Sequence, residues 1–394
     1  MALKNNTWTL NQWYDQDVAG NVSYSGAVGG FFGWGRNSEG DLAQNSTAVA
    51  HYSSPIQVST DSTWNFYPAG HSFVAGENLL TKTDGTLWSW GYNLYGQLGH
   101  NNLTEYSSPT QIPGTDWSTA IGSRGVSYAV KTNGTLWAMG GYNAQGSGGV
   151  NNIANFSSPI QIPGTTWGNK IYGNNTWAGA IKTDGTLWVW GYGKNGQLGQ
   201  NNTVQYSSPV QIPGTNWNRM SSGSEESAMA TKTDGTLWFW GYANHGGPGN
   251  GGGGAYAYSS PIQVGTATDW ALGEYKSSIG QYGQCNVIKT DGTLWSWGYT
   301  SYGICGDTQN HSSPVQMPGT NWNAVSNSYA RYIIATKTDG TLWSWGDNSS
   351  WMGGALFGDL AQGTRRSSPV QLPGTTVWDH VVATRRNAFA RNIL

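Results

Sequence analysis

The chain has 394 residues, a formal net charge of −2 at pH 7 and only 10% charged residues, yet it contains 58 Gly, 23 Trp and 21 Tyr. This near-neutral charge provides no electrostatic basis for binding nucleic acid or an anionic membrane. The abundant aromatics favour a packed, turn-rich β protein over a disordered chain. Residues 1–10 lack the features of a secretory signal peptide, and no apolar run is long enough for a transmembrane segment.

One phrase, Lys-Thr-Asp-Gly-Thr-Leu-Trp-x-Trp-Gly, recurs at steps of about 50 residues, which is the signature of a repeated supersecondary unit. Its copies begin at Lys82, Lys182, Lys232, Lys289 and Lys337, and a looser copy begins at Lys131. Such units must stack, because none can bury its apolar face alone. The repeat therefore predicts a single domain over residues 1–394.

Within a unit the expected elements follow a fixed order, as residues 117–164 illustrate. A first strand begins at Trp117, a second covers 127–130, a third covers 136–140 and a fourth covers 157–162. Asn133-Gly134 joins the second and third strands, and such a pair is a strong hairpin signal because the turn needs positive φ. A long polar loop precedes the fourth strand, and Pro163-Gly164 forms the turn after it.

Landmarks of the repeat indicate seven units and one incomplete copy. The Ser-Ser-Pro phrase occurs seven times, whereas the Trp that opens each unit occurs eight times. The units begin near Trp13, Trp64, Trp117, Trp167, Trp217, Trp270 and Trp322, and a closing half unit spans 378–394. We therefore expect an all-β, seven-bladed β-propeller of four-stranded antiparallel blades, closed by pairing of the C-terminal segment with the N-terminal blade.

The order Gly…Ala…Lys-Thr-Asp-Gly-Thr-Leu-Trp-Ser-Trp-Gly-Tyr-Asn…Gly-Gln-Leu-Gly resembles the regulator-of-chromosome-condensation repeat family of seven-bladed propellers. The near-identical repeats, rich in Asn-Asn-Thr and Tyr-Ser-Ser-Pro, are similar to its bacterial and phage branch. The resemblance implies a fold more than a function, because the repeat is a scaffold. Its best-known members are exchange factors for a nuclear small GTPase and bind chromatin. We expect that role not to carry over, because near-identical repeats offer little asymmetric polar surface.

Two kinds of connection are expected to vary between units and to share one face: those between the first and second strands, and those between the third and fourth. Binding residues concentrate on loops held by a rigid scaffold. We interpret this face as the contact surface. The alternative is that the loop sequences vary simply because they lie on the surface. The candidate partner-binding residues are His71, Arg124, Trp177, Glu225, Glu226, Tyr282, Tyr329, Arg331 and Trp351.

No motif for catalysis emerges. The six histidines share no metal-ligand spacing, and the Gly-rich stretch 246–254 lacks the Gly-Lys-Ser/Thr of a phosphate-binding loop. Asp84 and its equivalents are interpreted as turn residues. We predict no catalytic residue, no metal and no cofactor. Cys285 and Cys305 are either bridged or two buried thiols, and burial is favoured.

The first functional hypothesis is a non-enzymatic virion or appendage protein, such as a tail, baseplate or capsid-decorating adhesin. It would contact other virion or assembly proteins or a host-surface glycan, without binding nucleic acid or inserting in a membrane, and a homo-oligomer is left open. A location in a virion is then expected over the cytoplasm. The alternative is an intracellular regulatory protein-binding module such as a small-GTPase exchange factor. A propeller enzyme is the least favoured reading.

Overall fold

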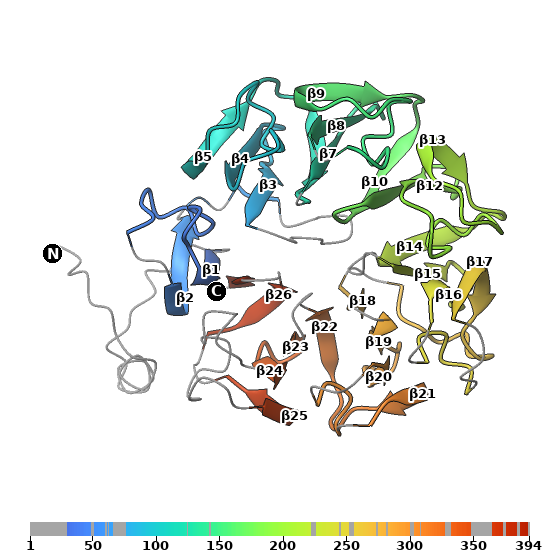
Figure 1. Cartoon of the computed structure of the whole chain (residues 1–394). Coiled ribbons are helices and arrows are strands. Elements are labelled where there is room, and N and C mark those ends of the chain that lie inside the picture. Colours follow the sequence, from blue (N-terminus) through green and yellow to red (C-terminus); the bar gives the residue numbers. More distant parts are fainter. Residues whose placement is uncertain are drawn as a thin grey trace, which may run out of the picture.

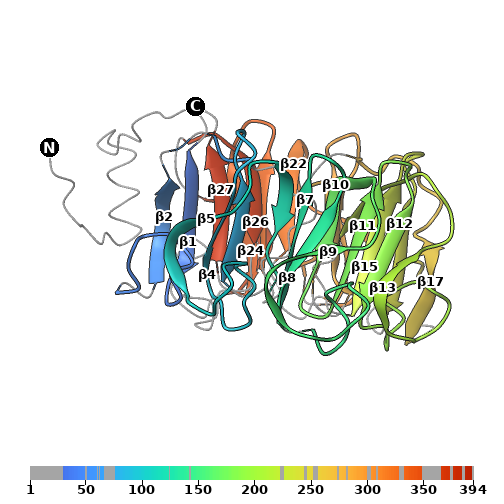
Figure 2. The ribbon, with the colours of Figure 1, turned by 90° about the horizontal axis from the view of Figure 1, so that it is seen from above.

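Seven antiparallel sheets follow one another around a central axis in the computed structural model of the chain (Figure 1). Seen at right angles to that axis, the molecule is a flat disc whose strands run between its two faces (Figure 2). The structure describes residues 30–48, 51–59, 61, 63–65, 76–123, 125–141, 143–221, 226–243, 246–251, 256–272, 275–280, 283–299, 303–307, 309–327, 332–347, 365–372, 376–383 and 387–392. The predicted all-β, seven-bladed propeller is confirmed.

Each sheet is one blade, and in blades 2 to 7 the strands follow chain order outward from the axis. Blade 3 contains β6 (Trp117–Ile121), β7 (Val126–Lys131), β8 (Leu136–Gly140) and β9 (Phe156–Ile162). Blade 4 contains β10 (Trp167–Gly173), β11 (Trp177–Lys182), β12 (Leu187–Gly191) and β13 (Tyr206–Gln211). Blade 5 contains β14 (Trp217–Ser221), β15 (Ser227–Lys232), β16 (Leu237–Tyr242) and β17 (Ala257–Gln263). Blade 7 contains β22 (Trp322–Asn327), β23 (Tyr332–Lys337), β24 (Leu342–Asp347) and β25 (Arg365–Gln371).

Blades 2 and 6 depart slightly from this plan. In its described residues blade 2 has β3 (Glu77–Thr81), β4 (Leu87–Gly91) and β5 (Tyr106–Ile112). Trp64 approaches this sheet through an isolated bridge to Lys82. Blade 6 has β18 (Ser277–Ile279), β19 (Cys285–Ile288), β20 (Leu294–Gly298) and β21 (His311–Gln316). Here Trp270 makes the equivalent bridge to Lys289.

Blade 1 joins the two ends of the chain. Its inner strands are β26 (Trp378–Ala383) and β27 (Asn387–Asn392), and its outer strands are β1 (Phe31–Arg36) and β2 (His51–Ser59). The rings of Phe31 and Phe389 lie 5.4 Å apart across the β1–β27 junction. The predicted closure is confirmed, and it removes two sheet edges that would otherwise remain unpaired.

The repeated phrase forms a hairpin turn in which each residue has a separate role. In blade 2, Asp84 Oδ1 accepts hydrogen bonds from Thr86 N (3.0 Å) and Thr86 Oγ1 (2.6 Å). The same hydroxyl accepts a bond from Trp88 Nε1 at 2.8 Å. Gly85 has a φ of +80°, and a Cβ there would lie 2.2 Å from the carbonyl oxygen of Thr115. Only Gly therefore fits this turn, which confirms that Asp84 is a turn residue.

The lysine of each repeated phrase packs between two tryptophan rings at the same end of its blade. Lys82 Nζ lies 4.5 Å from the ring of Trp64 and 4.3 Å from that of Trp88, and it forms a salt bridge of 2.8 Å to Asp61. An ammonium between two indoles is held by the negative faces of both rings. The other lysines placed between two indoles in this way are Lys131, Lys182, Lys232, Lys289 and Lys337.

The two cysteines are free thiols in the core, because Cys285 and Cys305 are both buried and unbridged. Ser296 Oγ lies 2.9 Å from Cys305 Sγ. Burial raises the pKa of Cys285 and raises that of Cys305 to about 12. Both thiols are therefore protonated near neutral pH and pack as small hydrophobic groups.

Candidate functional site

The four connections of each unit are divided between the two faces of the disc, as expected from alternating strands. The Asp-Gly and Pro-Gly turns meet on one face, here called the turn face, where Trp117 N donates to Gly85 O at 2.9 Å and Thr132 N donates to Asp116 O at 2.8 Å. The other two connections lie at the opposite ends of the same antiparallel strands, on what we call the loop face.

The structure describes two of the candidate partner-binding residues, Trp177 and Glu226. The candidates that lie outside the described residues are His71, Arg124, Glu225, Tyr282, Tyr329, Arg331 and Trp351. For these the loop-face assignment stays a prediction from the repeat.

Trp177 is a core residue, so the expectation that it belongs to an exposed loop is wrong. It is the first residue of β11, where it pairs with Gly191, and its relative exposure is 0%. It packs in one cluster with Tyr172 and Trp217, which joins blades 4 and 5. The connection before it is short, because the side chain of Asn174 accepts hydrogen bonds from Thr176 N and Trp177 N and so turns the chain within a few residues.

Glu226 keeps its place on the loop face. It immediately precedes β15, its carbonyl oxygen accepts a hydrogen bond from Tyr242 N at 2.9 Å, and its side chain is partly exposed. The blade therefore fixes its position at the loop-face end of β15.

The sequence interpretation missed a set of tyrosines on the loop face. Each directly follows the last Gly of the repeated phrase, and each is partly exposed: Tyr92, Tyr192, Tyr242 and Tyr299. Backbone bonds anchor them, since Tyr92 N donates to Gly76 O (3.2 Å) and Tyr192 N donates to Thr176 O (3.0 Å). The signal was the Gly-Tyr that ends the repeated phrase in several units. Tyrosine supplies a large amphipathic contact with little rotamer entropy to lose.

In blades 2 and 3 the long loop between the third and fourth strands is held by internal hydrogen bonds and by bonds to the next blade. Asn143 is fully buried. Its Nδ2 donates hydrogen bonds to Asn152 O and Ala154 O, and its Oδ1 accepts one from Gly148 N, all within the loop. At the end of the preceding long loop, Asn101 N donates to Ser157 O of the next blade at 2.8 Å. The loop face is thus carried on a rigid frame.

A cleft of about 450 Å³ opens between blades 2 and 3, away from the loop-face tyrosines. Its lining includes Pro113, Trp117, Lys131, Trp137 and His100. Lys131 is already paired with Asp116 at 3.1 Å. Burial lowers the pKa of His100, whose Nε2 lies 2.9 Å from the hydroxyl of the buried Ser89. These pairings engage the lysine and the histidine within the fold, and Pro113, Trp117 and Trp137 supply the apolar and aromatic part of the lining.

No group of three or more His, Cys, Asp or Glu side chains that could hold a metal ion occurs in the described ranges. Across those same ranges there is no helix with the length and hydropathy needed to cross a membrane.

Comparison with known proteins finds a known repeat in two parts of the chain. The profile of the Regulator of chromosome condensation (RCC1) repeat matches residues 84–123 and 184–229. Over 69 residues the chain is 35% identical to Protein RCC2 homolog of Danio rerio and to Protein RCC2 of Homo sapiens. That segment is 17% of this chain and only 14% and 13% of those two proteins, so most of their length has no counterpart in the match.

Solved structures show the same architecture. Prp20p from Saccharomyces cerevisiae, described with its binding properties to Gsp1p and histones, aligns with a TM-score of 0.78 at 17% identity and covers 94% of this chain and 92% of its own. Human WBSCR16 aligns with a TM-score of 0.75 at 16% identity, covering 93% and 99%. Yeast RCC1 (Prp20), solved bound to Kap60, reaches 0.76 at 16% identity, covering 100% and 94%. At these identities the likeness establishes the fold.

These relatives contradict the hypothesis of a virion or appendage protein. They are eukaryotic proteins of the RCC1 type, and their descriptions name Gsp1p, histones and Kap60 instead of virion proteins or a glycan. The near-identity of the repeats misled the interpretation, because it reflects what blade packing requires and says little about partners. The bacterial or phage branch and the location of the protein stay predictions. The chain is thus a seven-bladed β-propeller in which residues 84–123 and 184–229 match the RCC1 repeat.

Proposed function

We propose that this protein is a non-catalytic, intracellular regulator that binds a partner protein on its loop face, the partner being a small GTPase of the Gsp1p type. The observation that carries the proposal is the set of partly exposed tyrosines at one register in blades 2, 4, 5 and 6. The structural likeness to Prp20p, whose description names Gsp1p, supports the choice of partner class.

The physical argument is preorganisation. Tyr92 and Tyr192 are fixed through their backbone by the second strand of their own blades, and the long loops beside them are bonded to the neighbouring blade. A partner that docks on such a surface orders few side chains, so more of the contact energy remains as affinity. Tyrosines near the centre of an interface often contribute more than 1 kcal/mol each.

The two cysteines and the carboxylates of the hairpin turns are engaged within the fold, which supports a binding role over a catalytic one. Cys285 and Cys305 are buried thiols with raised pKa values. The carboxylates of the hairpin turns, such as Asp184, accept hydrogen bonds from the following threonine, and these bonds lower the pKa of Asp184. An acid held ionised by its own turn is poorly suited to donate a proton.

The test uses purified Gsp1p loaded with a fluorescent GDP analogue. We expect saturable binding of the propeller and faster release of the nucleotide, with the double variant Tyr92→Ala, Tyr192→Ala binding at least tenfold more weakly. Asp184→Asn on the turn face is the matched control and should bind like the wild type. The proposal is wrong if Gsp1p neither binds nor loses nucleotide faster, or if the turn-face variant weakens binding and the tyrosine variant does not.

A further inference from the structure

Three side chains of blade 5 form a row across neighbouring strands at the loop face. Glu226 precedes β15, Tyr242 ends β16, and Tyr256 precedes β17. The carbonyl of Glu226 accepts from Tyr242 N at 2.9 Å, and Tyr242 is the register partner of Ala257, next to Tyr256. The carbonyl of Tyr256 in turn accepts from Ala243 N at 2.9 Å. The blade therefore brings together residues that are 30 positions apart in the chain.

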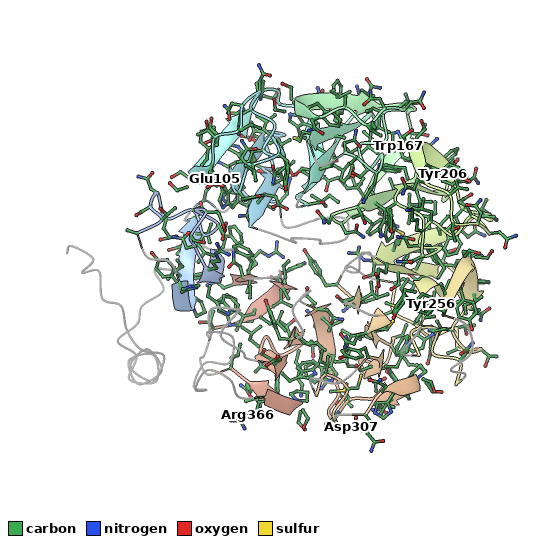
Figure 3. All side chains as sticks on the ribbon, viewed as in Figure 1. Glu105, Trp167, Tyr206, Tyr256, Asp307 and Arg366 are labelled. Atoms are coloured by element: carbon green, nitrogen blue, oxygen red, sulfur yellow. The ribbon has the colours of Figure 1, made fainter. Side chains whose placement is uncertain are left out.

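The two phenol rings of this row form an aromatic corner. Their centroids lie 4.8 Å apart and their planes are nearly perpendicular, at 86°. Tyr256 is 64% exposed, and both Tyr242 and Glu226 are partly exposed. Figure 3 shows Tyr256 over blade 5, beside β16 and β17. A side chain from solution can thus reach a ring face of this corner.

A negative charge lies beside the corner. The hydrogen bond to Tyr242 is the largest cause that raises the pKa of Tyr256, and the carboxylate charge of Glu226 adds to it. The register of Ser227 with Gly241 and the bond from Tyr242 N to Glu226 O place Glu226 directly beside Tyr242 at this end of the blade. An anionic group next to two electron-rich ring faces attracts a cation by two separate mechanisms.

Blades 2 and 4 lack this combination at the same places. In blade 4 the residue whose carbonyl receives the tyrosine N–H is Thr176, and the position of Tyr256 is taken by Val204, whose carbonyl approaches Gly193. In blade 2 the carbonyl comes from Gly76. The scaffold and the first tyrosine are shared by these three blades, and of the three only blade 5 has a glutamate and a second tyrosine at these places. The second ring of blade 2, Tyr95, comes from within the long loop and lies 6.2 Å from Tyr92. Packing of the blade does not require the glutamate and the second tyrosine, because blades 2 and 4 form without them.

We infer that Glu226, Tyr242 and Tyr256 form a binding site for an arginine side chain of a protein partner, an inference that rests on the proposed protein-binding role of the loop face. A guanidinium is planar and weakly hydrated, so it can stack on a phenol ring while its edge donates hydrogen bonds to a carboxylate. A lysine ammonium is a strongly hydrated point charge and lacks the flat face that the corner accommodates.

The first experiment probes the site without any partner protein. Saturation-transfer NMR measures contact of the intact propeller with the peptides acetyl-Gly-Arg-Gly-amide and acetyl-Gly-Lys-Gly-amide. We expect the signal of the arginine Hδ protons to exceed that of the lysine Hε protons, and to fall at least fivefold in Glu226→Gln and in Tyr256→Ala. Tyr256→Phe keeps the ring and should keep most of the signal.

The matched control lies in blade 4, where Val204→Ala alters the equivalent position and should leave the arginine signal unchanged. Tyr256 and Val204 are exposed, so all variants should keep the thermal midpoint of the wild type. Equal signals from the two peptides, or an arginine signal that survives in both Glu226→Gln and Tyr256→Ala, would overturn the inference.

The second experiment separates this inference from the proposed function. If Tyr92→Ala, Tyr192→Ala weakens binding of Gsp1p while Glu226→Gln and Tyr256→Ala change neither that binding nor the arginine signal, the protein-binding role stands and the arginine site is wrong. If Gsp1p does not bind at all but the arginine signal depends on Glu226 and Tyr256, the site stands and the proposed partner is wrong. About a tenfold loss of Gsp1p affinity in Tyr256→Ala supports both.

Discussion

The indole Nε1 of Trp90 donates a hydrogen bond of 3.0 Å to the backbone carbonyl of Asp41, which lies 49 residues earlier and in the preceding blade. Four more third-strand tryptophans, in blades 4 to 7, make the equivalent bond: Trp190 to Ser147, Trp240 to Gln197, Trp297 to Gly247 and Trp345 to Ile304. The repeat period in the sequence is thus also the step from one blade to the next. In these five blades the tryptophan that fills the blade also bonds it to its neighbour.

Truncating Trp90 should therefore strongly destabilise the ring. Trp90 is fully buried, and loss of a buried Trp side chain costs about 3–5 kcal/mol. We expect Trp90→Ala to lower the free energy of unfolding by that amount in urea denaturation. Leu103→Ala is the control, because Leu103 is 60% exposed, and its effect should stay within about 0.5 kcal/mol. A Trp90→Ala protein as stable as the control would show that the ring is held together elsewhere.

Trp177→Ala should act on stability as well. Its side chain is enclosed by the cluster between blades 4 and 5, so we expect a loss of about 3–5 kcal/mol in the free energy of unfolding. Tyr92→Ala, at a partly exposed site on the same face, should change stability by about 1 kcal/mol or less. Thermal unfolding of the two variants checks this, and an unchanged midpoint for Trp177→Ala would contradict the buried position.

The lysines placed between two indoles should stabilise the fold through their cation–π contacts with those rings. Lys182 Nζ lies 4.7 Å from the ring of Trp167 and 4.2 Å from that of Trp188. Lys182→Met keeps the length of the side chain and removes the charge, so we expect a loss of about 1 kcal/mol, the size of a partly desolvated cation–π contact. Lys182→Arg, which keeps a cation over the rings, is the control in the same urea titration. Equal stability of the wild type and the Met variant would argue against the contact.

Asp61 should make stability depend on pH in an acidic window. Hydrogen bonds from Lys82 and then Thr63 lower the pKa of Asp61 from 3.8 to about 2. A depressed folded-state pKa means that the ionised group stabilises the fold above the unfolded pKa, and that this stabilisation is lost as the pH falls through the folded pKa. The gap in stability between the wild type and Asp61→Asn should be full above about pH 4 and should close by about pH 2.

Urea midpoints of the two proteins across that range provide the measurement. Asp307→Asn, at a carboxylate paired with His311 instead of a lysine, serves as the comparison. A gap that stays constant from pH 5 to about pH 2 would show that Asp61 is not held ionised by Lys82.

Removing the closing strands should abolish cooperative folding. Deletion of residues 376–394 takes away β26 and β27, including Val381, Ala388 and Phe389 of the blade 1 core. It also exposes the edge of β1, which invites association between chains. We expect no cooperative thermal transition in that protein, whereas deletion of residues 393–394 alone should leave the transition intact. A stable, monomeric deletion protein would contradict closure through blade 1.

Features set by residues close together in the chain could be predicted from the sequence, whereas features set by distant residues could not. Gly85 requires positive φ, and Asp84 bonds the residue two positions on, so the hairpin was predictable from a few neighbouring letters. The virion hypothesis rested on composition and on the likeness of the repeats, neither of which contains a contact with a partner. Trp177 was misplaced because nothing in its own neighbourhood shows that it pairs with Gly191 and faces the next blade.

The repeat period, the hairpins and the closed ring of seven blades followed from the amino-acid sequence, because turn chemistry is local and a spacing that recurs reports on one repeated structural unit. Burial of Trp177 in the cluster with Trp217 and the bond from Trp90 to Asp41 became evident once the strands were placed side by side. Those relationships join residues tens of positions apart, and strand register and blade stacking determine which of them touch.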